Sequence, residues 1–272
     1  MPVTPRTIAN QLPYPVRAFT PAHGDLARSA GVPARLADEE YVEALARVVY
    51  YWGYPAVDVM SRTGQWESMK NGPGTMLGIF PGGPVNTASY LGDYMAPSQR
   101  IVVTPNNDTI YMSAFTDLGR EPAVIQTPAD VPKSHYWTIQ VADLFTNVIY
   151  QLGSAAGTPG GKYLLTGPDW KGEMPKGFLG LLPMPTNVCW VPGRSFAAHS
   201  PQSKNAARAV LGQVRDYPLS QDRPGPQNVD PAAIARNAVF PPGVTAQAVA
   251  ADPYAFRPEW VDAETFWDSL EK

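Results

Sequence analysis

Four side chains that could carry polar chemistry lie close together in the stretch "TPNNDTIYMSAF", residues 104–115: Asn106, Asn107, Asp108 and Tyr111. Asn and Asp stabilise tight reversals, so one interpretation is a turn in which an Asn is left-handed and Asp108 accepts backbone N–H bonds. The other is a site between two strands, with Asp108 as acid or base, Tyr111 as donor, and Asn106 and Asn107 binding the substrate. Both stay open, since one loop can be both.

Two further polar residues are candidates for substrate binding. In "HYWTIQVADLFTN", alternation places Gln140 with Tyr136 and Thr138 on one strand face, and the apolar opposite face should point at the core. Arg194, in "VPGRSF", either pairs with Asp143 or Asp108 or holds a substrate carboxylate in its guanidinium fork.

Several other chemistries lack the residues that they need. The three histidines, His23, His135 and His199, are far apart and show no metal-ligand spacing, so no metal is expected. Neither a G-x-S-x-G elbow nor a G-x-G-x-x-G fingerprint occurs, and no cofactor is expected. The single cysteine, Cys189, lies between Val and Trp and suits a buried apolar position rather than a nucleophile.

The elements that would position these residues are mostly strands. Between about 101 and 194, short runs rich in Val, Ile, Tyr, Trp and Thr end at Pro, Gly, Asn or Asp: "RIVVTP", "TIYMSAF", "PAVIQTP", "YWTIQVAD", "NVIYQLG", "KYLLTGP" and "NVCWVPG". Regular spacing without intervening helices predicts a mainly β, antiparallel jelly-roll-like β-sandwich.

Helices are expected on both sides of this sandwich. Apolar periodicity predicts a helix over 38–52, where Pro55 marks a break or kink before a second helix, and another over 201–214 with a Ser200 cap. A short helix is expected near "DPAAIARNA", and a last one after an Asp262 cap with an apolar stripe at Phe266, Trp267 and Leu270.

The chain is expected to have three parts: an extended arm over 1–37, a helical segment plus sandwich core over 38–220, and a Pro-rich segment with a C-terminal helix over 221–272 that packs on the core. The Gly-rich region 71–100 is a pocket wall or lid, or a plain connection.

The composition and charge of the chain argue against nucleic acid and membranes as binding partners. The 272 residues are 44% hydrophobic and 11% aromatic, enough for a large core. With 21 basic and 24 acidic residues, a net charge of −3 and no basic run, nucleic acid is not an expected partner. No run approaches the roughly 18 apolar residues of a membrane span, and the N-terminus lacks the apolar core of a signal peptide, so a cytoplasmic protein is expected.

Several stretches together resemble the bacterial domain of unknown function 1254 family: "YYWGYPAVDVMSRT", "GPVNT", "VVTPNNDTIYMSAFTDL", "YWTIQVADLFTNVIYQLG", "GKYLLTGPDWKGEMPKG" and "TNVCWVPGR". The similarity runs from about Ala46 to Tyr217. It implies a helical segment leading into a jelly-roll sandwich, and it implies no agreed activity. Many members continue into a second β domain, numbered 1214, which this chain does not show, so a homo-oligomer that covers the exposed surface is expected.

Two functions follow as hypotheses. The first is a cofactor-independent hydrolase, lyase or isomerase that acts on a small, partly apolar molecule in a pocket at one end of the sandwich. The second is a non-catalytic sandwich that binds a ligand or assembles with itself.

Overall fold

The computed structural model describes residues 39–67, 74–76, 80–82, 84–95, 104–236, 261 and 265–271. The expected arm over 1–37, the strand "RIVVTP" over most of its length, the Asp262 cap and much of 71–100 and 221–258 lie outside these residues.

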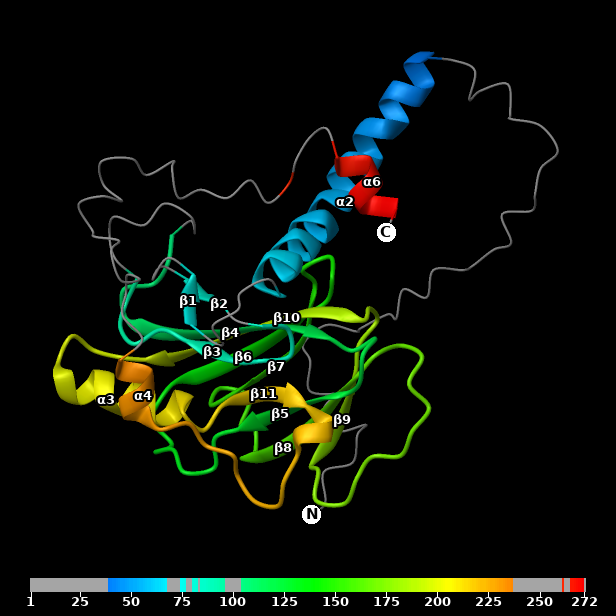
Figure 1. The fold of residues 1–272 in the computed structure, drawn as a ribbon. Helices are drawn as coiled ribbons and strands as arrows, with labels where there is room; N and C mark the ends of the chain where they lie inside the picture. The colour runs from blue at the N-terminus through cyan, green and yellow to red at the C-terminus, as the bar shows by residue number, and fades with distance from the viewer. Residues whose placement is uncertain are drawn as a thin grey trace.

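Two sheets face each other and form a sandwich (Figure 1). The five-stranded sheet has the order β3-β4-β10-β6-β7 and consists of β3 (Ser89–Tyr90), β4 (Thr109–Asp117), β10 (Val188–Phe196), β6 (Trp137–Ala142) and β7 (Val148–Gly153). The four-stranded sheet has the order β11-β5-β8-β9 and consists of β11 (Arg215–Pro218), β5 (Ala123–Thr127), β8 (Gly161–Thr166) and β9 (Gly180–Pro183). The prediction of a mainly β sandwich flanked by helices is confirmed.

The expectation of a wholly antiparallel arrangement is wrong at one edge. β8 and β9 pair in parallel, with Leu164 opposite Leu181, while the other pairs within the two sheets are antiparallel. The 13 residues from 167 to 179 join the two strands, which is long enough to return the chain to the starting end of β8. Periodicity within each strand carries no information about this direction.

Strand alternation gives each sheet an inner face and an outer face. The inner faces supply one core, to which the helix α3 (Pro201–Leu211) also contributes. The largest fully buried members of this core include Tyr163, Ile110, Met112, Ile125, Ile139 and Leu165. The expected division of β6 is confirmed, because Trp137, Ile139 and Val141 belong to this core. Tyr111 and Thr109 share the outer face of β4, as the same alternation predicts.

The first helix, α2 (Glu39–Glu67), is longer than expected and runs through Pro55. The prediction of two helices divided at Pro55 is therefore wrong. A proline in a helix removes one backbone hydrogen bond, and here the flanking residues Ala56 and Val57 are buried, so packing offsets that loss. Figure 1 shows α2 projecting away from the sandwich, with only its C-terminal half close to the β-strands.

Two shorter helices lie at one end of the sandwich (Figure 1). α3 (Pro201–Leu211) begins at the predicted Ser200 cap, whose hydroxyl accepts the N–H of Ser203 at 3.2 Å, and it ends before the predicted residue 214. α4 (Pro231–Ala235) follows an Asp230 cap in the predicted "DPAAIARNA" segment. Within the described helices, no segment is both long and apolar enough to cross a membrane.

The C-terminal helix α6 (Phe266–Glu271) packs on α2 and not on the sheets. The ring centroids of Phe266 and Tyr50 are 4.6 Å apart, and Leu270 lies so close to Gly53 that a Cβ there would be 2.7 Å from it. The absence of a side chain at Gly53 is what permits this close approach.

Candidate functional site

The turn before β4 is held by Tyr111. Its hydroxyl oxygen accepts the backbone N–H of Asn106 at 2.8 Å, and the residue with positive φ is Thr104, at 48°. The interpretation that an Asn is left-handed and that Asp108 holds the turn is therefore wrong in its details. The Tyr111 hydroxyl from the following strand stabilises the turn, in place of the Asp108 carboxylate that the turn interpretation expects.

Arg194 lies beside Tyr111 on the outer face of the five-stranded sheet. The two residues are opposite each other across β10 and β4, and the Arg194 guanidinium carbon is 5.7 Å from the Tyr111 ring centroid. On its other side Arg194 is opposite Thr138 of β6. Among the described residues no carboxylate pairs with the half-buried Arg194.

Neither of the two carboxylates proposed as partners of Arg194 pairs with it. Asp143 accepts the N–H groups of Phe145 and Asn147 and the side-chain amide of Asn147, so its oxygens stabilise the β6–β7 turn. The Asp108 side chain is exposed, with no hydrogen bond or ion pair to the rest of the described chain. A guanidinium that lies over an aromatic ring and has no carboxylate partner among the described residues is available to an external anion.

The outer face around Arg194 is unusually polar for its burial. Thr109, Ser89 and Ser113 point to the same side of β3 and β4, and all three are buried. Ser113 accepts the indole N–H of Trp190 at 2.9 Å, whereas the hydroxyl oxygens of Ser89 and Thr109 have no partner in the described structure. A buried hydroxyl without a partner is costly, which is one signature of a site where something else completes the hydrogen bonding.

Gln140 belongs to the same surface. It is half-buried on β6, one alternation away from Thr138, and opposite Gln151 of β7. The structure thus brings together Tyr111, Arg194 and Gln140, and places Asn106 at their edge through its bond to Tyr111. The exposed Asn107 and Asp108 lie in the turn that precedes β4.

Other elements flank this outer face. β1 (Gly74–Met76) and β2 (Phe80–Gly82) pair as a hairpin, which lies beside β3 and β4 (Figure 1). Toward the other end of the strands, Val59 of α2 packs on Phe115, with Trp190 in the same cluster. The Arg194 surface, comprising Tyr111, Thr138, Gln140 and Arg194, therefore belongs to a partly covered face.

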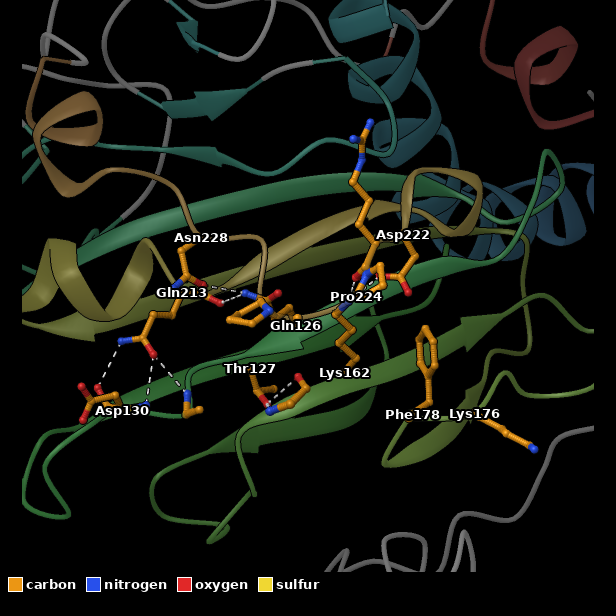
Figure 2. Close-up of a pocket in the computed structure, with 16 residues that line it drawn as sticks. Gln126, Thr127, Asp130, Lys162, Lys176, Phe178, Gln213, Asp222, Pro224 and Asn228 are labelled. Carbon is orange, nitrogen blue, oxygen red and sulfur yellow. Dashed lines mark hydrogen bonds and ion pairs between the residues drawn. The ribbon is translucent and has the colours of Figure 1, made fainter.

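A second region, which the sequence interpretation missed, is a cavity of about 630 Å³ on the outer side of the four-stranded sheet. Residues 222–228 fold over β5 and β8 there, and Phe178 and Lys176 stand at its side (Figure 2). Only the pairing of β5 with β8 and the return of this late segment bring these residues together, so no local pattern predicts the cavity.

Hydrogen bonds within the chain use most of the polar groups of this cavity (Figure 2). The buried Gln126 amide donates to the carbonyl of Gln213 at 2.7 Å and to Asn228 at 3.1 Å, and it accepts the N–H of Gln227 at 2.7 Å. Lys162 pairs with Asp222 at 2.6 Å. These bonds hold residues 222–228 on the sheet, so the polar groups that line the cavity serve mainly to stabilise the fold.

A buried carboxyl group lies between the two sheets. Asp216 of β11 points inward, and its Oδ2 accepts the hydroxyl of Thr116 from β4 at 2.7 Å, while Oδ1 has no partner in the described part. Burial raises the pKa of Asp216 to about 7, opposed by the Thr116 hydrogen bond and the charge of Arg215. No part of the sequence pattern marks this residue, since "RDYP" resembles a turn.

A Ser–His contact is also present but has no access to substrate. His135 Nε2 is 2.8 Å from the Ser195 hydroxyl, and burial lowers the pKa of His135. Ser195 is completely buried, so this pair completes internal hydrogen bonding. The described residues contain no group of three His, Cys, Asp or Glu side chains that could hold a metal. The predicted burial of Cys189 is confirmed, and burial raises the pKa of its thiol.

Fold and site together define a helix-flanked β-sandwich with a partly covered polar outer face. Residues 85–218 match the family described as "Protein of unknown function (DUF1254)". This segment, about half of the chain, thus matches the family, and the resemblance seen in the sequence is confirmed.

Two solved structures are similar to parts of the chain. The VPA0106 protein from Vibrio parahaemolyticus shares 21% identity, with a TM-score of 0.47, over 66% of this chain and 40% of that one. An uncharacterized protein from Burkholderia cenocepacia shares 13% identity, with a TM-score of 0.30, over 55% and 36%. This chain thus spans less than half the length of either. A comparison with curated proteins gave no match.

Proposed function

We propose that this protein binds a small, partly apolar carboxylate on the outer face of the five-stranded sheet, with Arg194 as the anchor. The observation that carries the proposal is the state of Arg194: half-buried, stacked on Tyr111 and without a carboxylate partner among the described residues. A guanidinium fork matches the two oxygens of a carboxylate, and the face supplies aromatic surface for an apolar body.

The neighbouring polar groups complete such a site. Tyr111 uses its oxygen as an acceptor for Asn106, so its own proton remains available for donation. Gln140 is half-buried on the same face and makes no hydrogen bond to the described residues. The unpartnered hydroxyl groups of Thr109 and Ser89 lie on the same side of the sheet.

The test is ligand-induced stabilisation with defined probes. Benzoate and hexanoate should raise the melting temperature saturably, whereas the isosteric neutral probes benzamide and hexanamide should not, because a ligand stabilises by its affinity for the folded state. Arg194→Gln should abolish the shift. Arg223→Gln removes the same charge from the exposed segment over the other sheet and should leave the shift unchanged.

Two results would overturn the proposal: no saturable shift with either acid in the wild-type protein, or an equal shift in Arg194→Gln. Loss of the shift in Arg223→Gln as well would indicate a nonspecific charge effect and would also count against it.

Acid–base catalysis on the bound molecule, as a hydrolase, lyase or isomerase without a cofactor, is the second candidate function. The retained Tyr111 proton beside the Arg194 cation favours it, with Asp108 in the adjoining turn as the second acid–base group. Incubation of 3-phenylpropionate in D₂O, followed by NMR, tests for proton exchange next to the carboxylate. Tyr111→Phe or Asp108→Asn should reduce exchange by roughly 10²-fold or more. No exchange in the wild-type protein would leave binding as the function.

A further inference from the structure

Two exposed aromatic side chains lie next to each other on the outer face of the five-stranded sheet. Phe196, the last residue of β10, is 41% exposed, and Tyr136, which directly precedes β6, is 42% exposed. The backbone N–H of Phe196 donates to the carbonyl of Tyr136 at 2.9 Å, so the two residues are opposite each other. A single exposed apolar residue is ordinary, whereas two adjacent ones form a small patch.

The strand registers arrange this face in rows that run across β4, β10 and β6. Arg194 lies in one row, between Tyr111 of β4 and Thr138 of β6. Phe196 lies in the next row, beside Tyr136. Neighbouring rows on one face are about 6.8 Å apart, since residues two positions apart in a strand are separated by twice the rise of about 3.4 Å. The aromatic pair is thus the direct neighbour of the Arg194 row.

The row on the other side of Arg194 has a different character. It contains Pro192, which pairs with the buried Ser113, and the half-buried Gln140. This row offers a proline and two polar groups, and the opposite row offers two exposed rings. The apolar part of a molecule held by Arg194 therefore finds the larger aromatic surface on the side of Phe196.

We infer that the molecule held by Arg194 is an aromatic monocarboxylate whose ring lies against Phe196 and Tyr136. The inference rests on the proposed function and adds to it the class of ligand and the two residues that select this class. The ring of such an acid, joined to the carboxylate through one or two carbon atoms, extends from the guanidinium to the neighbouring row. Aromatic rings attract one another in offset-stacked or edge-to-face geometry, beyond the effect of the buried area alone.

The charges of this face favour a ligand with a single carboxylate. Among the side chains of these three rows, Arg194 is the one with a charge. A second carboxylate on the ligand would lie against aromatic rings without a cation, and a desolvated charge without a partner is costly.

The area of the aromatic pair favours a small molecule over a protein partner. Two side chains of this size that are about 40% exposed offer roughly 160 Å² together, whereas each partner of a standard protein interface contributes roughly 800 Å². The pair is large enough to cover one face of a single ring.

The test compares 3-phenylpropionate with propionate, which lacks the phenyl ring, by ligand-observed NMR titration of the full chain. The wild-type protein should bind 3-phenylpropionate about tenfold more tightly, because the ring leaves water on binding. 2-Phenylsuccinate, which adds a second carboxylate to the same skeleton, should bind more weakly than 3-phenylpropionate. An equal or higher affinity for 2-phenylsuccinate would contradict the single-carboxylate class.

Two variants identify the residues that contact the ring. Phe196→Ser and Tyr136→Ser should each lower the ratio of the two affinities from about tenfold to about twofold, since each removes one of the aromatic partners. Val148→Ser is the matched control, because Val148 of the same sheet is 49% exposed but pairs with Ala142, at the other end of β6 from Tyr136. This variant should keep the wild-type ratio, and circular dichroism verifies folding of all three.

The outcomes separate this inference from the proposed function. Equal wild-type affinities for the two acids, or an unchanged ratio in both serine variants, would overturn the inference while propionate binding supports Arg194 as the anchor. Absence of binding of either acid would overturn both. A lowered ratio in Val148→Ser would indicate a nonspecific effect and count against the inference. A dimer that Phe196→Ser dissociates, with the ratio unchanged, would assign the aromatic pair to a contact between copies instead.

Discussion

Gln126 and Gln140 are the same residue type on the outer faces of the two sheets, and their surroundings differ. Gln126 makes three hydrogen bonds, one to Gln213 and two to Gln227 and Asn228 of the segment that folds over it. Gln140 makes none to the described residues. The two cations show the same difference, since Lys162 pairs with Asp222, whereas the Tyr111 ring is the recorded contact of the Arg194 guanidinium among the described residues.

The contrast separates polar side chains that hold the fold from those that remain available to a ligand. A buried polar group costs free energy unless it is paired, so the paired set on the four-stranded sheet contributes stability. The unpaired set on the five-stranded sheet contributes little to stability and is the better candidate for binding.

Asp216, which lies between the two sheets, should give the largest effect on the free energy of unfolding. Burial raises the pKa of Asp216 from 3.8 to about 7, so the folded protein keeps a proton that the unfolded chain releases over this range. The contribution of this group to stability is full below about pH 4, declines as the pH rises and is lost above about pH 7, by up to about 4 kcal/mol.

Urea unfolding at several pH values measures this decline, and Asp216→Asn should remove most of it. The exposed Asp169→Asn should leave the pH profile as it is in the wild type. A profile that is the same in wild type and Asp216→Asn would show that the buried carboxyl is not the titrating group.

The next largest effect should come from the glutamine pair. Gln126→Leu leaves the N–H of Gln227 and the carbonyl of Gln213 without their partners under the covering segment, so we expect a loss of about 3 kcal/mol in the free energy of unfolding. Gln140→Leu should change it by less than about 0.5 kcal/mol. Equal losses of unfolding free energy in the two variants, measured by urea unfolding, would show that Gln126 does not stabilise the fold more than Gln140.

Lys162 and Arg194 should differ in the same direction, with smaller losses in the free energy of unfolding. Lys162→Met removes a partly buried ion pair and leaves Asp222 with the Tyr217 hydroxyl alone, so a loss of about 2 kcal/mol is expected. Arg194→Met removes only the contact with the Tyr111 ring, worth less than about 1 kcal/mol. In the benzoate assay the order should reverse, with Arg194→Met losing binding and Lys162→Met retaining it.

A stability effect smaller than that of Lys162→Met is expected at Tyr111. Phe at this position keeps the ring under Arg194 but removes the oxygen that accepts the Asn106 N–H, which should cost about 1 kcal/mol in thermal or urea unfolding. The exposed Tyr136→Phe is the control and should change little. A Tyr111→Phe protein as stable as the wild type would mean that the turn does not depend on this hydroxyl.

Local sequence patterns predicted most of the longer strands, the helix starts and the two faces of β4 and β6. Alternation in "YWTIQVAD" identified the core face of β6, the Ser200 cap identified the start of α3, and the run "DPAAIARNA" indicated the short helix α4, because these features depend on residues a few positions apart. The sequence also brought forward Tyr111, Gln140 and Arg194, which share one face since alternation and strand pairing agree there. The break predicted at Pro55 is wrong, because packing of the helix turns around it overrides the local tendency of proline to end a helix.

Tertiary structure decided how the strands pair and which polar groups find partners. β9 and β11 were missed because "GLLP" and "RDYP" are too short to show a period, and they are strands only because β8 and β5 pair with them. Asp216 meets Thr116 across 100 positions, and Gln126 meets Asn228 across 102. Whether a side chain is satisfied or left available depends on such distant contacts, since its own neighbours in the chain do not set its burial or its hydrogen bonds.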